Sequence, residues 1–153
     1  MNKPDFKSLV IKQMILDVEE KIHLSKGQIN SINHSKSSAT KSSAGDKHET
    51  GRAMMERELA IAEFQIQKAL LQKADIGNLQ NVPSDDGEVR FGSLVHTSNG
   101  YFILGIGLGK ITTDGSMCFA ISSASPIGKE LMGKKEGDLF EFNSSEIEIL
   151  SIT

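Results

Sequence analysis

Two heptad repeats of mostly apolar residues constrain the fold of this 153-residue chain more than any other feature. Between residues 11 and 32, such residues recur at alternating spacings of four and three, with Ser25 as the one polar exception. The second repeat, between residues 55 and 76, is weaker because it contains two alanines and Lys73. This spacing places the side chains on one stripe of each helix, the a and d positions of a coiled coil. The stripe residues are Ile11, Ile15, Val18, Ile22, Ser25, Ile29 and Ile32, followed by Met55, Leu59, Ala62, Ile66, Ala69, Lys73 and Ile76.

The segment between the two repeats predicts the bend of an antiparallel helical hairpin. Residues 33–45 are mostly serine and other small polar residues, which cannot form a core, so we expect a flexible and partly disordered tip. Asp46 and Glu49 follow directly. We expect residues 1–80 to form the hairpin, with its tip near residues 33–49. Acids at a tip stabilise the hairpin little, but they are well placed to contact another molecule.

The pattern changes after the second repeat. Helical periodicity ends near Gly77, and residues 81–88 form a linker that contains proline, aspartate and glycine. Residues 89–153 then contain short β-type stretches, with a hairpin turn signal at Asn99-Gly100. We expect strands at 89–97, 101–108, 115–121, 139–142 and 147–152, and a core that includes Phe91, Phe102, Phe119, Phe140 and Phe142.

One short helix is expected among these strands. Ser125 suits its N-cap, Pro126 its first turn and Gly133 its end. The segment from Gly105 to Lys110 is glycine-rich, but it lacks phosphate-loop spacing and is interpreted as a strand that runs into a turn. The expected fold is therefore α+β: a coiled-coil hairpin, then a small antiparallel sheet domain with one helix.

Composition excludes several classes of protein. Residues 1–80 carry 12 Lys+Arg and 10 Asp+Glu, whereas residues 81–153 carry 5 and 10, so the C-terminal half is acidic and unsuited to gripping a nucleic-acid backbone. A single cysteine, Cys118, excludes an internal disulfide framework and makes a zinc site improbable. Because there is also no signal-peptide pattern or membrane-spanning run, we expect a cytoplasmic protein that does not bind membranes.

Three stretches of the C-terminal region resemble the C-terminal domain of the Gre transcript-cleavage factors of bacterial RNA polymerase. They are VRFGS at 89–93, SPIGKELMGKKEGD at 125–138 and EILSI at 148–152. The order of hairpin, linker and sheet domain also matches that family. The resemblance implies an FKBP-like fold in residues 89–153 that docks on the rim of the polymerase secondary channel, while the coiled coil enters the channel.

The resemblance also implies the residues that carry the function. Part of the polymerase contact would come from Ser125, Pro126 and Ile127. At the tip, Asp46 and Glu49 would help to hold a Mg²⁺ ion that is shared with the polymerase and not stably bound by the free protein. The chain would then be no enzyme itself, but a monomer that stimulates cleavage of backtracked RNA and meets nucleic acid only inside the polymerase complex.

The tip matches the family pattern in part. That pattern is Gly-Asp, two variable positions, then Glu-Asn, and the sequence has both acids at the same spacing, in Asp46 and Glu49. It departs at Lys47, where the family usually has an apolar residue, and at Thr50, where the family has asparagine. These departures bear on cleavage more than on the fold.

Other interpretations of the acid pair remain open. An Asp-x-x-Glu sequence at a helix start is also a capping box, in which both carboxylates accept hydrogen bonds from free backbone N–H groups. Asp46 and Glu49 could cap the helix in the free protein and bind metal in a complex. Two other functions are compatible with the sequence: a modulator that binds the polymerase channel without supporting cleavage, and an unrelated coiled-coil interaction protein.

Overall fold

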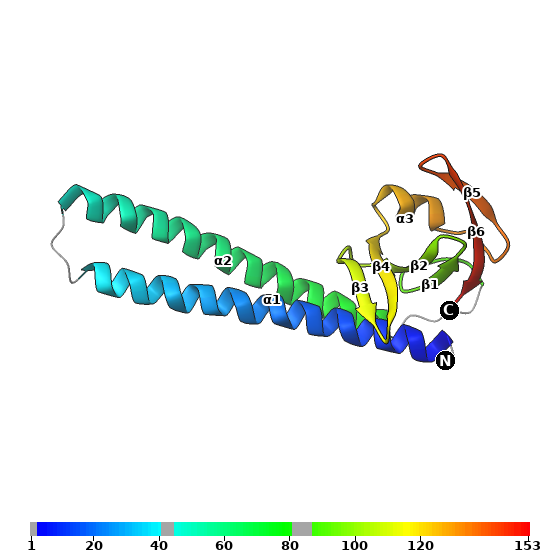
Figure 1. Cartoon of the computed structure of the whole chain (residues 1–153), viewed down its shortest axis with the longest axis horizontal. Coiled ribbons are helices and arrows are strands. Elements are labelled where there is room, and N and C mark those ends of the chain that lie inside the picture. The colour runs from blue at the N-terminus through cyan, green and yellow to red at the C-terminus, as the bar shows by residue number, and fades with distance from the viewer. Residues whose placement is uncertain (1–2, 41–44, 81–86) are drawn as a thin grey trace. The chain divides into compact units, whose positions relative to one another are not determined.

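The computed structural model describes residues 3–40, 45–80 and 87–153 (Figure 1). Residue contacts divide the chain into two units, Asp17–Lys73 and Met1–Leu16 together with Ala74–Thr153. The first unit is a pair of helices. The second contains the sheet, the beginning of the first helix and the end of the second. The elements are α1 (Lys3–Thr40), α2 (Gly45–Leu79), β1 (Leu94–Thr97), β2 (Gly100–Gly105), β3 (Gly109–Thr113), β4 (Ser116–Ser122), α3 (Pro126–Leu131), β5 (Leu139–Phe142) and β6 (Ser145–Ile152).

The helices of the first unit form an antiparallel hairpin, as predicted. Glu19 of α1 pairs with Lys73 of α2 at 3.2 Å, and Lys36 of α1 pairs with Glu56 of α2 at 3.9 Å. Residues later in α1 thus pair with residues earlier in α2, so the two helices run antiparallel. Between the helices, Val18, Ile22, Ser25, Ala62 and Ala69 are buried, while Ile29, Ile32, Met55, Leu59 and Ile66 are half-buried.

Two details of the hairpin differ from the prediction. The first helix continues to Thr40, although we expected a non-helical tip from Asn33. Residues 33–40 contain no proline or glycine to end the helix, and each added residue gains a backbone hydrogen bond. Lys73 is exposed and paired with Glu19, because its charge is better hydrated outside the helix interface than within it. The segment 41–44 of the expected tip lies outside the described residues.

The sheet has the strand order β3-β4-β2-β1-β6-β5, and it is mixed, not purely antiparallel as expected. Its parallel pair is β2 with β4. The sequence prediction missed β3, which the chain forms by reversing after β2. A second reversal at Asp114-Gly115 then brings β4 between β3 and β2, in the direction of β2.

The face of the sheet next to α3 holds a core cluster of eight buried residues: Val89, Val95, Phe102, Leu104, Leu131, Phe140, Ile147 and Ile149. The prediction that all five phenylalanines fill this core is wrong for two of them. Phe91 is 38% exposed because it lies in a turn before β1, not in a strand, and Phe119 is 36% exposed on β4. The six-residue helix α3 is too short to cover that whole face.

The ends of the two long helices belong to the unit that contains the sheet. The ring of Phe6 lies 4.7 Å from that of Tyr101, and Lys7 Nζ donates a hydrogen bond to the carbonyl oxygen of Thr153 at 3.2 Å. At the end of α2, the Leu79 side chain lies against Gly105 of β2. In the parts of the chain that the structure describes, no helix is apolar enough over a sufficient length to cross a membrane.

Candidate functional site

The predicted acid pair lies in the first turns of α2. This helix begins at Gly45, so Asp46 belongs to its first turn. Asp46 and Glu49 are three residues apart, and positions with this spacing share one side of a helix. The backbone therefore brings both positions together, directly after the connection between the two helices. Their side chains lie outside the described residues.

The nearest described acid of α2 behaves differently. Glu56 pairs with Arg52 of its own helix at 3.6 Å and with Lys36 of α1 at 3.9 Å. Two basic groups therefore offset its charge, which makes it a poor candidate for holding a cation. In the described parts of the chain, no group of three or more His, Cys, Asp or Glu side chains is arranged to hold a metal ion.

The second predicted site begins α3. Ser125 is the N-cap: its Oγ accepts a hydrogen bond from Gly128 N at 3.1 Å and donates one to Ser122 O at 2.6 Å. Pro126 occupies the first helical position and is exposed, as the sequence predicted. Gly128 is required by packing, because a Cβ atom there would collide with Ser122 O and lie 2.8 Å from Ser125 Oγ. The start of α3 is thus fixed against the end of β4.

Ile127 has a double role in this geometry. Its side chain is half-buried and packs against the core cluster, yet it also lines an open cavity of about 440 Å³. The aromatic and aliphatic residues around it come from three strands: Phe102 from β2, Phe119 and Ile121 from β4, and Phe142 from β5. Asn99 also lines it. The sequence predicted Ile127 as a site residue, but it assigned Phe119 to the interior. The alternation of large Met117, Phe119 and Ile121 with small Cys118 and Ala120 in β4 was the available signal.

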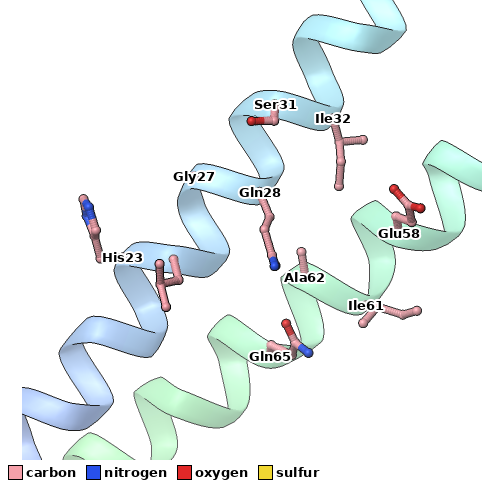
Figure 2. Close-up of a pocket in the computed structure, with 10 residues that line it drawn as sticks. His23, Gly27, Gln28, Ser31, Ile32, Glu58, Ile61, Ala62 and Gln65 are labelled. Carbon is pink, nitrogen blue, oxygen red and sulfur yellow. The ribbon is translucent and has the colours of Figure 1, made fainter.

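A groove of about 660 Å³ runs between the helices of the hairpin (Figure 2). Gln28 of α1 and Ala62 of α2 point toward each other across it, and Ile32 and Glu58 lie toward its far end (Figure 2). The groove exists because small residues such as Ala62 occupy the interface and leave space beside them. Only the small residues of the second heptad repeat indicated it in the sequence.

Burial shifts the pKa of two side chains in the unit that contains the sheet. Desolvation raises the pKa of the Cys118 thiol to about 12, against a weaker opposing effect of a backbone hydrogen bond with Ile103. The thiol therefore stays protonated and is an inert core residue, not a nucleophile. Desolvation also lowers the pKa of Lys7, whose ammonium lies near the C-terminal carbonyl.

The geometry defines a class of protein in two parts: a helical hairpin with an acid pair beside its connection, and an α+β sheet domain with a capped helix beside an apolar cavity. Residues 84–153 match the family model for the C-terminal domain of the transcription elongation factors GreA/GreB. This region of the chain is therefore similar to the C-terminal domain of GreA/GreB transcription elongation factors. Comparison with curated proteins found no match.

Proposed function

We propose that this protein binds RNA polymerase through its C-terminal domain, inserts the hairpin into the secondary channel and stimulates cleavage of backtracked RNA. The observation that carries the proposal is the Asp46-x-x-Glu49 pair beside the helix connection, in a chain whose residues 84–153 match the GreA/GreB C-terminal domain. The protein would act on the nuclease activity of the polymerase and would have none of its own.

The proposed chemistry needs both partners. Mg²⁺ prefers six oxygen ligands and keeps several waters, so two carboxylates alone bind it weakly. Asp46 and Glu49 would complete a site for a second ion beside the one that the polymerase holds. In a two-metal site, the second ion lowers the pKa of a bound water and directs its attack on the phosphodiester.

The start of α3 would form part of the surface that contacts the polymerase. An exposed proline beside a half-buried isoleucine presents a rigid apolar surface, since Pro126 has a fixed φ and Ile127 is held by core packing. Rigid apolar anchors bind well because little conformational entropy is lost when they are covered. Ser125 would contribute by fixing the first turn of α3 through its two hydrogen bonds.

The direct test is a transcript-cleavage assay on stalled elongation complexes with and without this protein. Asp46→Asn and Glu49→Gln keep the size of each side chain but remove the charge that a cation requires. Each substitution should abolish most of the stimulated cleavage while polymerase binding and helix content by circular dichroism stay unchanged. Glu63→Gln is the matched control, because this exposed acid lies on α2 away from the connection.

The outcomes separate the proposed function from its alternatives. Unchanged cleavage by the double variant Asp46→Asn/Glu49→Gln would show that the acids only support the helix start. A wild-type protein that binds the polymerase and stimulates no cleavage would instead be a channel-binding modulator. Lys47 and Thr50, which depart from the family pattern at the tip, would then be the first residues to replace by the residue types of that pattern. Absence of binding would leave an interaction protein of another kind.

A further inference from the structure

The outer side of α2 carries a second apolar stripe. At about 100° per residue, its middle lies nearly opposite the side that faces α1, while Ile61, toward one border, also lines the groove between the helices (Figure 2). Its large apolar members are among the most exposed in the described residues: Phe64 is 68% exposed, Leu71 69% and Met54 60%. We call it the outer stripe, and it consists of Met54, Arg57, Ile61, Phe64, Lys68 and Leu71.

The spacing of the outer stripe is that of a helix–helix contact. Its members follow one another at alternating intervals of three and four residues, as at the a and d positions of a coiled coil. Isolated exposed apolar residues need no explanation, but a contiguous row at this spacing marks an interaction surface. Such a row fits a partner helix laid along α2.

The charges of the outer stripe are all positive, and the first acid at the same spacing, Asp75, lies beyond its end. Arg57 and Lys68 are its two charged members, and neither forms an ion pair with any residue that the structure describes. The acids of the same helix segment, Glu56, Glu58 and Glu63, lie at other angles around α2. A helix covering the stripe would therefore have to neutralise two cations.

A second copy of this chain does not meet that requirement. An antiparallel self-pairing that joins Met54 to Leu71 and Ile61 to Phe64 necessarily sets Arg57 against Lys68 of the other copy. A parallel self-pairing sets each of these cations against itself. Like charges in register oppose association, so both of these registers disfavour the homodimer. An antiparallel register shifted by one heptad would join Arg57 to Asp75, but it would set Lys68 against Phe64 of the other copy and leave that cation unpaired.

An anionic membrane is also a poorer fit. Helices that lie in a membrane interface carry their basic residues along the border of the apolar face. Here Arg57 and Lys68 lie within the apolar row, and acids such as Glu63 and Glu58 flank it on either side. These acids would face the anionic headgroups.

We propose that the outer stripe binds an amphipathic helix of a partner protein that has acidic residues within its apolar face. Two acids of that helix, about 16 Å apart at roughly 1.5 Å per residue, would pair with Arg57 and Lys68. Its apolar residues would cover Ile61 and Phe64 between them. A helix without the acids would bury two unpaired cations and be rejected. This interaction does not depend on the acid pair at the helix connection.

The test uses the full-length protein and two synthetic peptides of about 21 residues, each cross-linked to hold it helical. Both carry leucine opposite the four apolar positions of the outer stripe. One carries glutamate, and the other lysine, at the two positions that face Arg57 and Lys68. Measured by fluorescence anisotropy, the acidic peptide should bind at least about ten-fold tighter, and added salt should reduce the difference.

Variants make the test specific. The double variant Arg57→Glu/Lys68→Glu should reverse the preference between the two peptides. Phe64→Ser/Leu71→Ser should weaken binding of the acidic peptide by at least about ten-fold with no loss of helix content, since both side chains are exposed. Leu24→Ser is the matched control, because Leu24 is an exposed apolar residue of α1 outside the stripe.

Three results would overturn the proposal. The first is equal or undetectable binding of the two peptides. The second is a concentration-dependent dimer in analytical ultracentrifugation that Phe64→Ser/Leu71→Ser abolishes, which would make a second copy the occupant. The third is sedimentation with phosphatidylserine vesicles that the same variant abolishes, which would make the occupant a membrane.

Discussion

Two helical glycines should respond in opposite directions to the same substitution. Gly27 lies in α1, where a Cβ atom would have nothing within 4 Å, whereas Gly128 lies in α3, where a Cβ atom would collide with Ser122 O. Neither glycine has a positive φ angle, so alanine is conformationally acceptable at both positions. The difference between Gly27→Ala and Gly128→Ala in their effect on the free energy of unfolding therefore separates the contribution of packing from that of helix propensity.

The magnitudes follow from these surroundings. Glycine in a helix interior is less favourable than alanine by about 0.5–1 kcal/mol, so Gly27→Ala should raise the free energy of unfolding of the hairpin by that amount. Gly128→Ala should cost about 1–3 kcal/mol through overpacking. Displacing Ser125, whose Oγ lies 2.8 Å from the added atom, should weaken the cap and cost roughly 1 kcal/mol more.

The two units can be followed separately in one urea titration. Circular dichroism at 222 nm reports mainly the long helices, and the reactivity of Cys118 with a thiol reagent reports the sheet, because this is the only cysteine and it is buried in β4. Gly27→Ala should raise the midpoint of the first signal and leave the second unchanged. Gly128→Ala should lower the midpoint of the second. A destabilised hairpin in Gly27→Ala, or an unchanged sheet in Gly128→Ala, would refute the packing argument.

Two further outcomes are expected in the unit that contains the sheet. Ile127→Asp should weaken polymerase binding while the protection of Cys118 persists; if that protection is lost instead, Ile127 acts through packing and is no docking anchor. Because burial raises the pKa of Cys118 to about 12, the folded thiol keeps its proton where the unfolded thiol loses it. The free energy of unfolding should therefore fall as pH rises from about 9 to about 12, by at most ~1.4 kcal/mol per pH unit. Cys118→Ala should remove this part of the decline. The lowered pKa of Lys7 makes the free energy of unfolding rise with pH, and this opposite contribution should persist in that variant.

Local patterns predicted the helices well because a helix is encoded by the spacing of residues along the chain. The alternation of four and three residues identified the buried side of both long helices, and the Ser125-Pro126 pair identified the start of α3. The strand β3 escaped prediction for a physical reason. It is an edge strand in which only Ile111 is buried, so it has no alternating apolar signal.

Pairings between distant segments could not be predicted in the same way. The parallel pairing of β2 with β4 joins strands that are separated in the chain by β3, and no local pattern encodes it. The cavity beside Ile127 likewise needs Phe142 and Asn99, which come from other strands and turns. At the hairpin, the sequence placed Asp46 and Glu49 beside the helix connection, but their metal-binding role remains a prediction.

Most of the motif at the start of α3 can be explained without any partner. Ser125 caps the helix, Pro126 suits its first turn and Gly128 is the only residue that fits against Ser122. The local structure alone therefore accounts for these three residues. Ile127 is different, because it packs against the core and still exposes part of its side chain beside an open apolar cavity, where a partner could contact it. The proposed docking therefore depends on Ile127 more than on the length of the motif. Likewise, the proposed role in cleavage depends on the charge of Asp46 and Glu49, since amide side chains retain part of any capping ability but do not replace the charge that holds Mg²⁺.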